Sequence, residues 1–334
     1  MAARNKRCQA AYCAGNEPRA DCCRNERTRE YMSKTAFIFP GQGAQYCGMG
    51  KDFYDTYETA RQVFELAGKA TGLDVAELCF TENDKLNITE YTQIAMLTTE
   101  VAILKVIREK GLKADCCAGL SLGEYGALAA AEVMETEDLF RLIRSRGIYM
   151  QEAYPIGGAM TAVLGLDADT IKGVCDAVDG IVSIANDNCP GQIVIPGVER
   201  AVQEAAGKLM EAGARKCVPL KVSGPFHSAL LSGAGEKLAA ELKSVNVKDP
   251  VIPYLGNVEA DYVTDSSRVK ELLAKQVSGT VRWRESVERM IADGVDTFIE
   301  IGPGKTLTGF LRKIDRNVTA KNVETVEDLD KLFE

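Results

Sequence analysis

Apolar side chains follow two different spacings along the chain. Short continuous apolar runs, the first at 35–39, are bounded by turn residues such as Pro40-Gly41 and are typical of buried strands. Between them lie longer stretches in which apolar residues recur every three or four positions, which predicts helices that bury one face. Strands that alternate with helices indicate a parallel sheet covered on both faces. In the first half we expect strands at 35–39 and 114–118 and helices at 51–70, 92–110, 122–131 and 136–152.

The middle of the chain has a different order of elements. The pattern predicts strands at 158–165, 181–185, 192–196 and 215–220, with helices at 168–178 and 199–212. This is the β-α-β-β-α-β order of a ferredoxin-like α+β domain. After it we expect helices at 228–243, 266–277 and 283–293, a strand at 296–301 and a helix from 305. The predicted fold is therefore α/β, with a large domain (32–155 and 223–334) interrupted by a small domain (156–222), and the cleft between them is the expected ligand site.

The first 31 residues differ from the rest. They hold seven basic and four acidic residues and four cysteines, without apolar periodicity. There is no hydrophobic core of a secretory signal, and the acidic residues argue against a mitochondrial transit peptide. We interpret 1–31 as a disordered leader or an artefact of an upstream start site. A metal-binding or targeting arm is the alternative.

Composition excludes several classes of protein. The 334 residues are 46% hydrophobic and 26% charged, which fits a globular protein of about two domains. The net charge of −8 argues against a general nucleic-acid binder, and no apolar run of about 18 residues predicts a membrane span. Eleven cysteines without a C-x-x-C spacing indicate reduced thiols in a cytoplasmic protein. The single histidine, His227, excludes zinc sites built on several histidines.

A candidate nucleophile lies between a predicted strand and a predicted helix. Gly119-Leu-Ser-Leu-Gly123 matches the G-x-S-x-G elbow, in which a sharp turn exposes the serine above the sheet. The backbone N–H of Leu122, at the start of the helix, would then point at an oxyanion formed there. Ser121 needs a base to remove its proton, and His227 is the only imidazole in the chain. No aspartate is near His227 in sequence, so a backbone carbonyl is a candidate to orient its ring.

Six motifs occur in an order typical of one enzyme family. They are Phe39-Pro-Gly-Gln-Gly-Ala-Gln45, Gly119-Leu-Ser-Leu-Gly-Glu-Tyr125, Arg146-Gly147, Asn188-Cys-Pro-Gly-Gln192, Gly224-Pro-Phe-His227 and Ile301-Gly-Pro-Gly-Lys-Thr-Leu-Thr308. Over about residues 32 to 315 the chain thereby resembles the malonyl-CoA:acyl carrier protein transacylases of fatty acid synthesis. This resemblance implies an α/β-hydrolase-like core with a ferredoxin-like insertion, which agrees with the predicted elements.

The resemblance also implies a role for individual residues. Ser121 would be the acylated nucleophile and His227 its general base, while Arg146 would pair with the free carboxylate of the malonyl group. A planar guanidinium suits that bidentate contact better than an ammonium does. The remaining matches are the backbone N–H groups of Gln42 and Leu122 as an oxyanion hole, the backbone carbonyl of Gln276 as the group that orients His227, and Gln93 and Asn188 as polar neighbours of the site.

Two positions next to these residues matter for the comparison with the family. Leu120 departs from the family, which often has histidine before the nucleophile, so this neighbour cannot act as the base here. Phe226 resembles the malonyl-selecting form of the histidine loop, whereas methylmalonyl-selecting relatives tend to have a small residue there.

The implied reaction is a ping-pong transfer from CoA to the phosphopantetheine thiol of acyl carrier protein, with no metal or redox cofactor. We expect a monomer with neither a nucleic-acid nor a membrane partner. An acidic carrier protein would need a local basic surface on this acidic chain. The candidates for that surface are Arg215, Lys216, Lys305, Arg312, Lys313 and Arg316.

Three other functions remain open from the sequence. A stand-alone acyltransferase of a polyketide synthase would differ mainly in its carrier. An acyl-thioester hydrolase could use the same serine and histidine but would not need Arg146. A non-catalytic scaffold would not need both Ser121 and His227.

Overall fold

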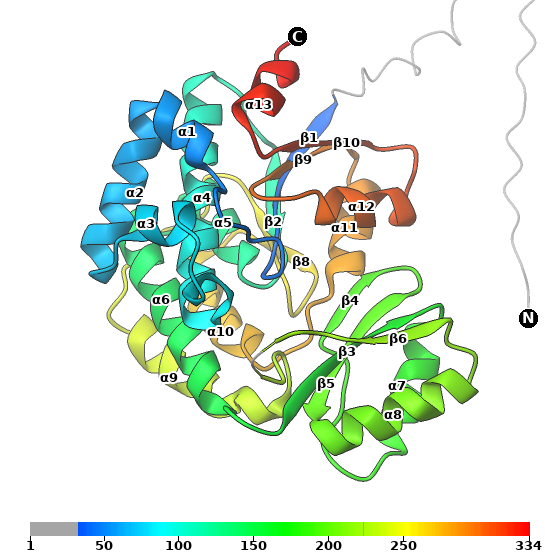
Figure 1. Ribbon diagram of the computed structural model, residues 1–334. Coiled ribbons are helices and arrows are strands. Elements are labelled where there is room, and N and C mark those ends of the chain that lie inside the picture. Colours follow the sequence, from blue (N-terminus) through cyan, green and yellow to red (C-terminus); the bar gives the residue numbers. More distant parts are fainter. Residues whose placement is uncertain (1–32, 223) are drawn as a thin grey trace, which may run out of the picture. The chain divides into compact units, whose positions relative to one another are not determined.

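The computed structural model describes residues 33–222 and 224–334, so the predicted leader over 1–31 lies outside the described residues. The described part contains two sheets surrounded by helices (Figure 1). Within these two ranges, no helix has both the length and the apolar character needed to cross a lipid bilayer.

The larger sheet has six strands in the order β10-β9-β1-β2-β7-β8. Its neighbours pair in parallel except for β7 and β8, which are antiparallel. The register aligns Phe39 with Gly119 and Ile38 with Glu300, so three strands end at one edge of the sheet. The loops that follow these strands therefore meet at that edge, where open parallel sheets bind ligands. The strands are β1 (Lys34–Phe39), β2 (Cys116–Gly119), β7 (Tyr254–Gly256), β8 (Asp261–Val263), β9 (Val295–Ile301) and β10 (Thr319–Val323).

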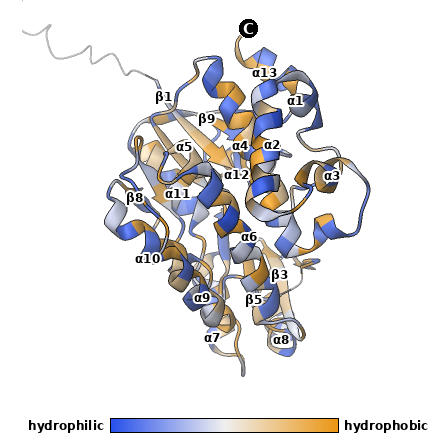
Figure 2. Ribbon diagram, turned by 90° about the vertical axis from the view of Figure 1, so that its left-hand side faces the viewer, coloured by the Kyte–Doolittle hydropathy of each residue, from blue (hydrophilic) through white to orange (hydrophobic). Residues whose placement is uncertain are grey.

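Successive side chains of a strand point to opposite faces of the sheet, and on this sheet both faces are buried. Phe37 and Phe39 belong to a large apolar cluster with α1 to α6, α9, α10 and α13, whereas Ala36 and Ile38 pack in a second cluster with α11 and α12. Figure 2 shows the hydrophobic strands inside and polar residues on the outer faces of the helices. The helices are α1 (Lys51–Thr56), α2 (Glu58–Thr71), α3 (Val75–Phe80), η1 (Lys85–Asn87), α4 (Thr89–Glu109), α5 (Gly123–Ala130), α6 (Thr136–Ala153), η2 (Ala229–Leu231), α9 (Ser232–Leu242), α10 (Ser266–Gln276), α11 (Trp283–Ala292), α12 (Thr306–Ile314) and α13 (Val326–Leu332).

The smaller sheet is antiparallel, with the order β4-β5-β3-β6. Val163, Ile193 and Ile195 face α7 and α8 in a third apolar cluster, while Met160 and Val194 on the other face belong to the large cluster. One face of this sheet thus packs against α7 and α8, and the other packs against the large domain (Figure 1). Its elements are β3 (Gly158–Leu164), α7 (Ala168–Asp176), β4 (Asn186–Cys189), β5 (Gln192–Val198), α8 (Glu199–Glu211) and β6 (Lys216–Pro219). The predicted fold class, a parallel-sheet α/β core with a ferredoxin-like insertion, is confirmed.

Some predicted elements differ from the observed ones. The helix expected at 51–70 is two helices, because Tyr57 is extended between α1 and α2. The strand expected at 181–185 is wrong: this segment runs beside β5, but regular pairing begins only at Asn186, after a single bridge between Val182 and Gly197. The helix expected at 228–243 begins as the short η2. The short elements α3, η1, β7, β8, β10 and α13 were not predicted.

Candidate active site

Ser121 occupies a sharp turn between β2 and α5. Its φ of 55° is in the left-handed region, which non-glycine residues seldom adopt outside functional sites. A Cβ at Gly119 would lie 1.9 Å from the Gly123 carbonyl oxygen, and one at Gly123 would lie 2.2 Å from the Phe39 carbonyl oxygen. Both positions therefore require glycine, and the strained turn presents the serine hydroxyl at the edge where the parallel strands end.

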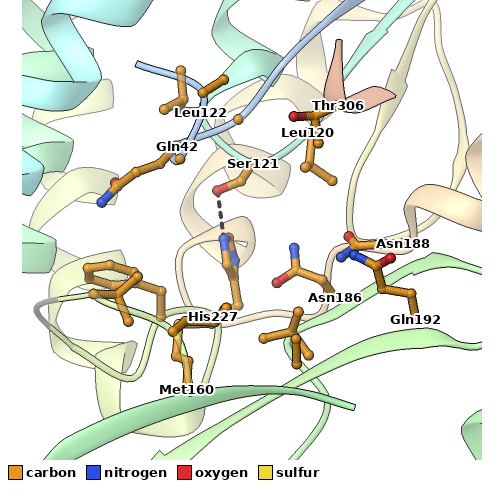
Figure 3. Close-up of a pocket in the computed structure, with 18 of the residues that line it drawn as sticks. Gln42, Leu120, Ser121, Leu122, Met160, Asn186, Asn188, Gln192, His227 and Thr306 are labelled. Atoms are coloured by element: carbon orange, nitrogen blue, oxygen red, sulfur yellow. Dashed lines mark hydrogen bonds between the residues drawn. The ribbon is translucent and has the colours of Figure 1, made fainter. Parts of the chain in front are cut away.

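His227 faces this hydroxyl from the loop before η2, also with a left-handed φ, of 59°. Its Nε2 lies 2.6 Å from Ser121 Oγ (Figure 3). Its Nδ1 lies 2.9 Å from the carbonyl oxygen of Gln276 and 3.2 Å from that of Gly279. Since a carbonyl can only accept, Nδ1 carries the proton and Nε2 presents its lone pair to the serine. Gln276 is the last residue of α10, where helix carbonyls lack intrahelical partners.

The electrostatic surroundings keep His227 neutral. Burial and, to a smaller extent, the positive charge of Arg146 lower the pKa of His227 to about 4, although the two carbonyl contacts act in the opposite direction. A neutral imidazole that touches a serine hydroxyl is ready to accept its proton.

Arg146, on α6, is completely buried beside this pair. Its Nη1 donates to Gln93 Oε1 at 2.7 Å, and its Nη2 donates to Gln276 Oε1 at 2.9 Å and to Ser121 Oγ at 3.2 Å. Among the described residues, no carboxylate lies within ion-pair distance of this guanidinium. A buried cation of this kind, held by two neutral amides, is suited to bind an anionic group of a ligand next to the serine hydroxyl.

Ser121 and His227 line a cleft of about 290 Å³ between the large and the small sheet. Gln42, Leu120 and Leu122 line it on the side of the large sheet. Asn186, Asn188 and Gln192 lie across the cleft on the strands of the small sheet (Figure 3).

The structure brings most of the sequence-predicted site residues to this cleft. Gln42 directs its side chain away from Ser121, toward Thr89, to which its Nε2 donates at 3.2 Å (Figure 3). Leu122 follows the serine at the start of α5, and Phe226 lies buried beside His227. Asn188 is part of the opposite wall, and among the residues described its side chain forms no hydrogen bond with Ser121, His227 or Arg146.

Two buried residues near the elbow were not predicted from the sequence. Asn257, after β7, accepts from the backbone N–H of Ser121 at 2.8 Å and donates to the carbonyl of Gly119 at 2.7 Å. Glu124, three residues after the nucleophile, accepts from the N–H of Asn257 at 3.2 Å and from Gln276 Nε2 at 2.9 Å. Glu124 had a detectable signal, because it lies within the motif at 119–125 that carries the nucleophile. Asn257 had none, since it is 136 residues away from Ser121.

The six basic residues expected to form a docking surface are all exposed, and among the described residues none of them forms an ion pair. Lys313 donates to Gln192 Oε1 at 2.9 Å, and Gln192 lines the cleft. The strand register places Gln192, Leu164 and Lys216 in one row across the small sheet. Lys305 precedes Thr306, another cleft residue. Lys305 and Lys313 therefore lie at the rim of the cleft, beside Thr306 and Gln192, and Lys216 lies in the row of the small sheet that contains Gln192.

Metal ligands are not gathered in the part of the chain that the structure describes. Residues 33–222 and 224–334 contain no group of three or more His, Cys, Asp or Glu side chains that could hold a metal ion. The seven cysteines in these ranges are free thiols.

Comparison with known proteins gives one consistent result. The model of the acyl transferase domain family matches residues 36–330. The chain is 44% identical over 304 residues to the malonyl CoA-acyl carrier protein transacylase of Bacillus subtilis, covering 89% of this chain and 96% of that protein. The crystal structure of the corresponding transacylase from Clostridium perfringens has a TM-score of 0.87 at 43% identity and covers 90% of this chain and 96% of that one.

A further solved structure includes a partner. It is a malonyl-transacylase in complex with its type II PKS acyl-carrier protein, with a TM-score of 0.87 at 39% identity, covering 90% of this chain and 98% of that one.

Proposed function

The chain belongs to the acyl transferase family, and from this premise we propose that it transfers the malonyl group of malonyl-CoA to an acyl carrier protein in fatty acid biosynthesis. The observation that carries this proposal is the position of Arg146: a completely buried guanidinium, without a carboxylate partner among the described residues, lies 3.2 Å from the hydroxyl of Ser121. A site that bound only neutral acyl groups would gain nothing from this buried charge.

In the first half of the reaction, His227 Nε2 removes the proton of Ser121 Oγ as the oxygen attacks the thioester carbon of malonyl-CoA. The backbone N–H groups of Gln42 and Leu122 hold the oxyanion of the tetrahedral intermediate, and each such donor contributes about 3 kcal/mol. The intermediate collapses when the bond to sulfur breaks, and CoA leaves with the proton returned by His227. Ser121 is left as a malonyl ester.

The malonyl carboxylate binds Arg146 in both the substrate and the ester. Gln93 and Gln276 orient the guanidinium, so that it can bind the carboxylate with two parallel hydrogen bonds. Phe226 fills the space beside His227, which leaves little room for a methyl branch on the malonyl group.

In the second half, the phosphopantetheine thiol of the carrier protein enters the emptied CoA site. His227 takes the thiol proton, sulfur attacks the ester carbonyl, and Ser121 leaves with the proton. This ping-pong sequence uses only the residues of the chain, the malonyl-CoA thioester and the carrier thiol, so we assign it no metal or redox cofactor. Asn188 lies on the wall along which the pantetheine arm would run.

The two candidate acceptors are carriers of different pathways. The neighbour solved with a type II PKS acyl-carrier protein makes a polyketide carrier the second candidate. The cleft does not distinguish the two carriers, because both present the same phosphopantetheine arm to it. We propose that the protein is cytoplasmic, which the free thiols of the seven cysteines in the described ranges support, and that one chain forms a complete site.

Incubation with radiolabelled malonyl-CoA tests the proposed function. We expect label to appear on the protein alone and to pass to phosphopantetheinylated carrier protein when it is added. A fatty acid carrier and a polyketide carrier, supplied separately, identify the acceptor by their kcat/KM values. Release of free malonate at the same rate with and without a carrier would instead indicate a thioester hydrolase.

The basic residues at the rim predict how the carrier binds. Reversing the charge of Arg312 and Lys313 together should raise the KM for carrier protein by about tenfold, since each rim charge contributes modestly to association. The KM for malonyl-CoA measured by serine acylation should stay within about twofold, and added salt should reduce the difference between variant and wild type.

The matched control for this experiment is charge reversal of Lys172, which is exposed on α7, and Lys208, which is partly exposed on α8. An unchanged KM for the carrier in the Arg312 and Lys313 variant would remove α12 from the docking surface.

A further inference from the structure

Glu124 is a buried carboxylate that the mechanism does not use. Only 1% of the residue is exposed, although it is one turn away from the nucleophile on α5. Its Oε2 accepts two hydrogen bonds, from the N–H of Asn257 and from Gln276 Nε2, and its Oε1 has no partner among the described residues. A buried carboxylate is costly unless its charge is compensated, so its neighbours should explain why it is there.

The amide of Gln276 connects this carboxylate to Arg146. Gln276 Nε2 donates to Glu124 at 2.9 Å and to the carbonyl of Ser121 at 2.8 Å, while Oε1 of the same amide accepts from Arg146 Nη2 at 2.9 Å. Because the carboxylate accepts from the NH₂ end, it fixes the orientation of the amide, and the oxygen end must face the guanidinium. Glu124 therefore positions Arg146 without touching it.

Arg146 and Glu124 also compensate each other electrostatically. Arg146 is a buried cation with only neutral hydrogen-bond partners, and Glu124 is a carboxylate on the far side of one amide. With Glu124 ionised, the empty site has no net charge, and a bound malonyl carboxylate adds one negative charge. With Glu124 protonated, the empty site is positive and the carboxylate neutralises it. The second arrangement binds an anion better.

The other titratable groups around Glu124 do not change charge near neutral pH. Burial raises the pKa of Glu124 to about 7, against the lowering effects of the Asn257 N–H, Gln276 and Arg146. Burial raises the pKa values of the neighbouring tyrosines and thiol, and it lowers that of the histidine, so each of these stays neutral. The groups that face Glu124 or its partners are Arg146 on α6, Tyr125 on α5, Cys117 on β2, Tyr254 on β7 and His227 before η2.

We propose that Glu124 acts through Gln276 as the positioning carboxylate that balances Arg146 in the empty site and takes up a proton from solvent when a malonyl carboxylate binds Arg146. This inference rests on the proposed function, because it needs a substrate with a free carboxylate. No bond other than the O–H of Glu124 forms in this step. Protonated Glu124 binds the anion better, so the affinity for malonyl thioester falls as pH rises through the pKa of the empty site, by up to about tenfold per pH unit.

Calorimetry with the full-length Ser121→Ala protein tests the proposal, since this variant binds malonyl-CoA without being acylated. Titrations near pH 8 in buffers of different ionisation enthalpy give the number of protons taken up. We expect malonyl-CoA to take up about half a proton or more beyond the uptake with acetyl-CoA. Acetyl-CoA is the matched ligand, because it has the same phosphates and lacks only the carboxylate. Equal uptake for the two ligands would overturn the proposal without requiring any change at Glu124.

The variant Glu124→Gln, combined with Ser121→Ala, assigns the effect to its residue. Glutamine keeps the size of the side chain and can still accept from Gln276, so the malonyl-specific uptake should disappear while malonyl-CoA still binds. Persistence of that uptake would show that another group titrates. With Ser121 restored, Glu124→Gln should also make the KM for malonyl-CoA independent of pH between about 6.5 and 8.5.

The test of Glu124 can fail while the proposed malonyl transfer holds, and the two failures can be told apart. Intact mass of the wild-type protein after mixing with malonyl-CoA reports whether the malonyl ester forms. Absence of the ester contradicts the proposed function, whereas an ester that forms in a protein without malonyl-specific proton uptake contradicts only the role of Glu124.

Discussion

Replacing Ser121 with alanine should abolish the malonyl ester and lower transfer to the carrier by about 10⁴-fold or more. The hydroxyl of Ser121 is the atom that His227 Nε2 touches at 2.6 Å, and a methyl group cannot form the covalent intermediate. The buried core should be unaffected, because the side chain points into the cleft (Figure 3). Intact mass spectrometry after rapid mixing with malonyl-CoA measures the ester, and labelled carrier measures the transfer.

The control for this substitution is Ser244→Ala, the same change at an exposed serine after α9, whose hydroxyl donates to the carbonyl of Glu241 at 2.9 Å. Its acylation rate should equal that of the wild type. Transfer by Ser121→Ala at the rate of this control would mean that another residue, or direct transfer between the two thiols, carries the reaction.

The predictable part of the fold is the part with strong local patterns. β1, β2 and β9 are runs of buried residues between helices of regular period, and their positions follow from those patterns. β8 and β10 are edge strands of the large sheet, with sequences DYV and TAKNV, which mix polar and apolar residues without a clear alternation. Such strands are stabilised by pairing with a neighbour, which the local sequence does not encode.

The same distinction applies to the site. Ser121 could be predicted because its motif spans five adjacent residues, and His227 because the chain has no other imidazole. The roles of Arg146 and Gln276 came from the resemblance to a family. The contacts of Asn257 could not be predicted, because they depend on β7 pairing with β2 through Cys117 and Tyr254. That pairing carries the loop after β7 to the nucleophile from a distant part of the sequence.

Replacing Arg146 with alanine should remove the preference for malonyl over acetyl groups. The guanidinium is the only positively charged group described in contact with Ser121 Oγ, and loss of one partner of a buried charge pair costs about 2–5 kcal/mol. We therefore expect kcat/KM for malonyl-CoA to fall by about 10²- to 10³-fold, and acetyl transfer to rise because the site no longer holds an unpaired cation. Arg146→Lys should recover only part of the loss, since an ammonium cannot make two parallel hydrogen bonds. Competition between labelled malonyl-CoA and acetyl-CoA in one reaction measures the ratio directly.

The control is Arg141→Ala on the same helix. Arg141 is about half exposed and pairs with Glu137 and Asp138 on the outer face of α6, so its loss removes a charge from the helix without changing the site. Its malonyl-to-acetyl ratio should match that of the wild type. If Arg146→Ala also kept that ratio while both variants remained folded, the carboxylate would bind elsewhere and the buried arginine would serve only to hold Gln93 and Gln276. Selectivity and positioning are thus separable at this residue, because Arg146→Lys keeps a cation near both amides but loses the planar fork that recognises a carboxylate.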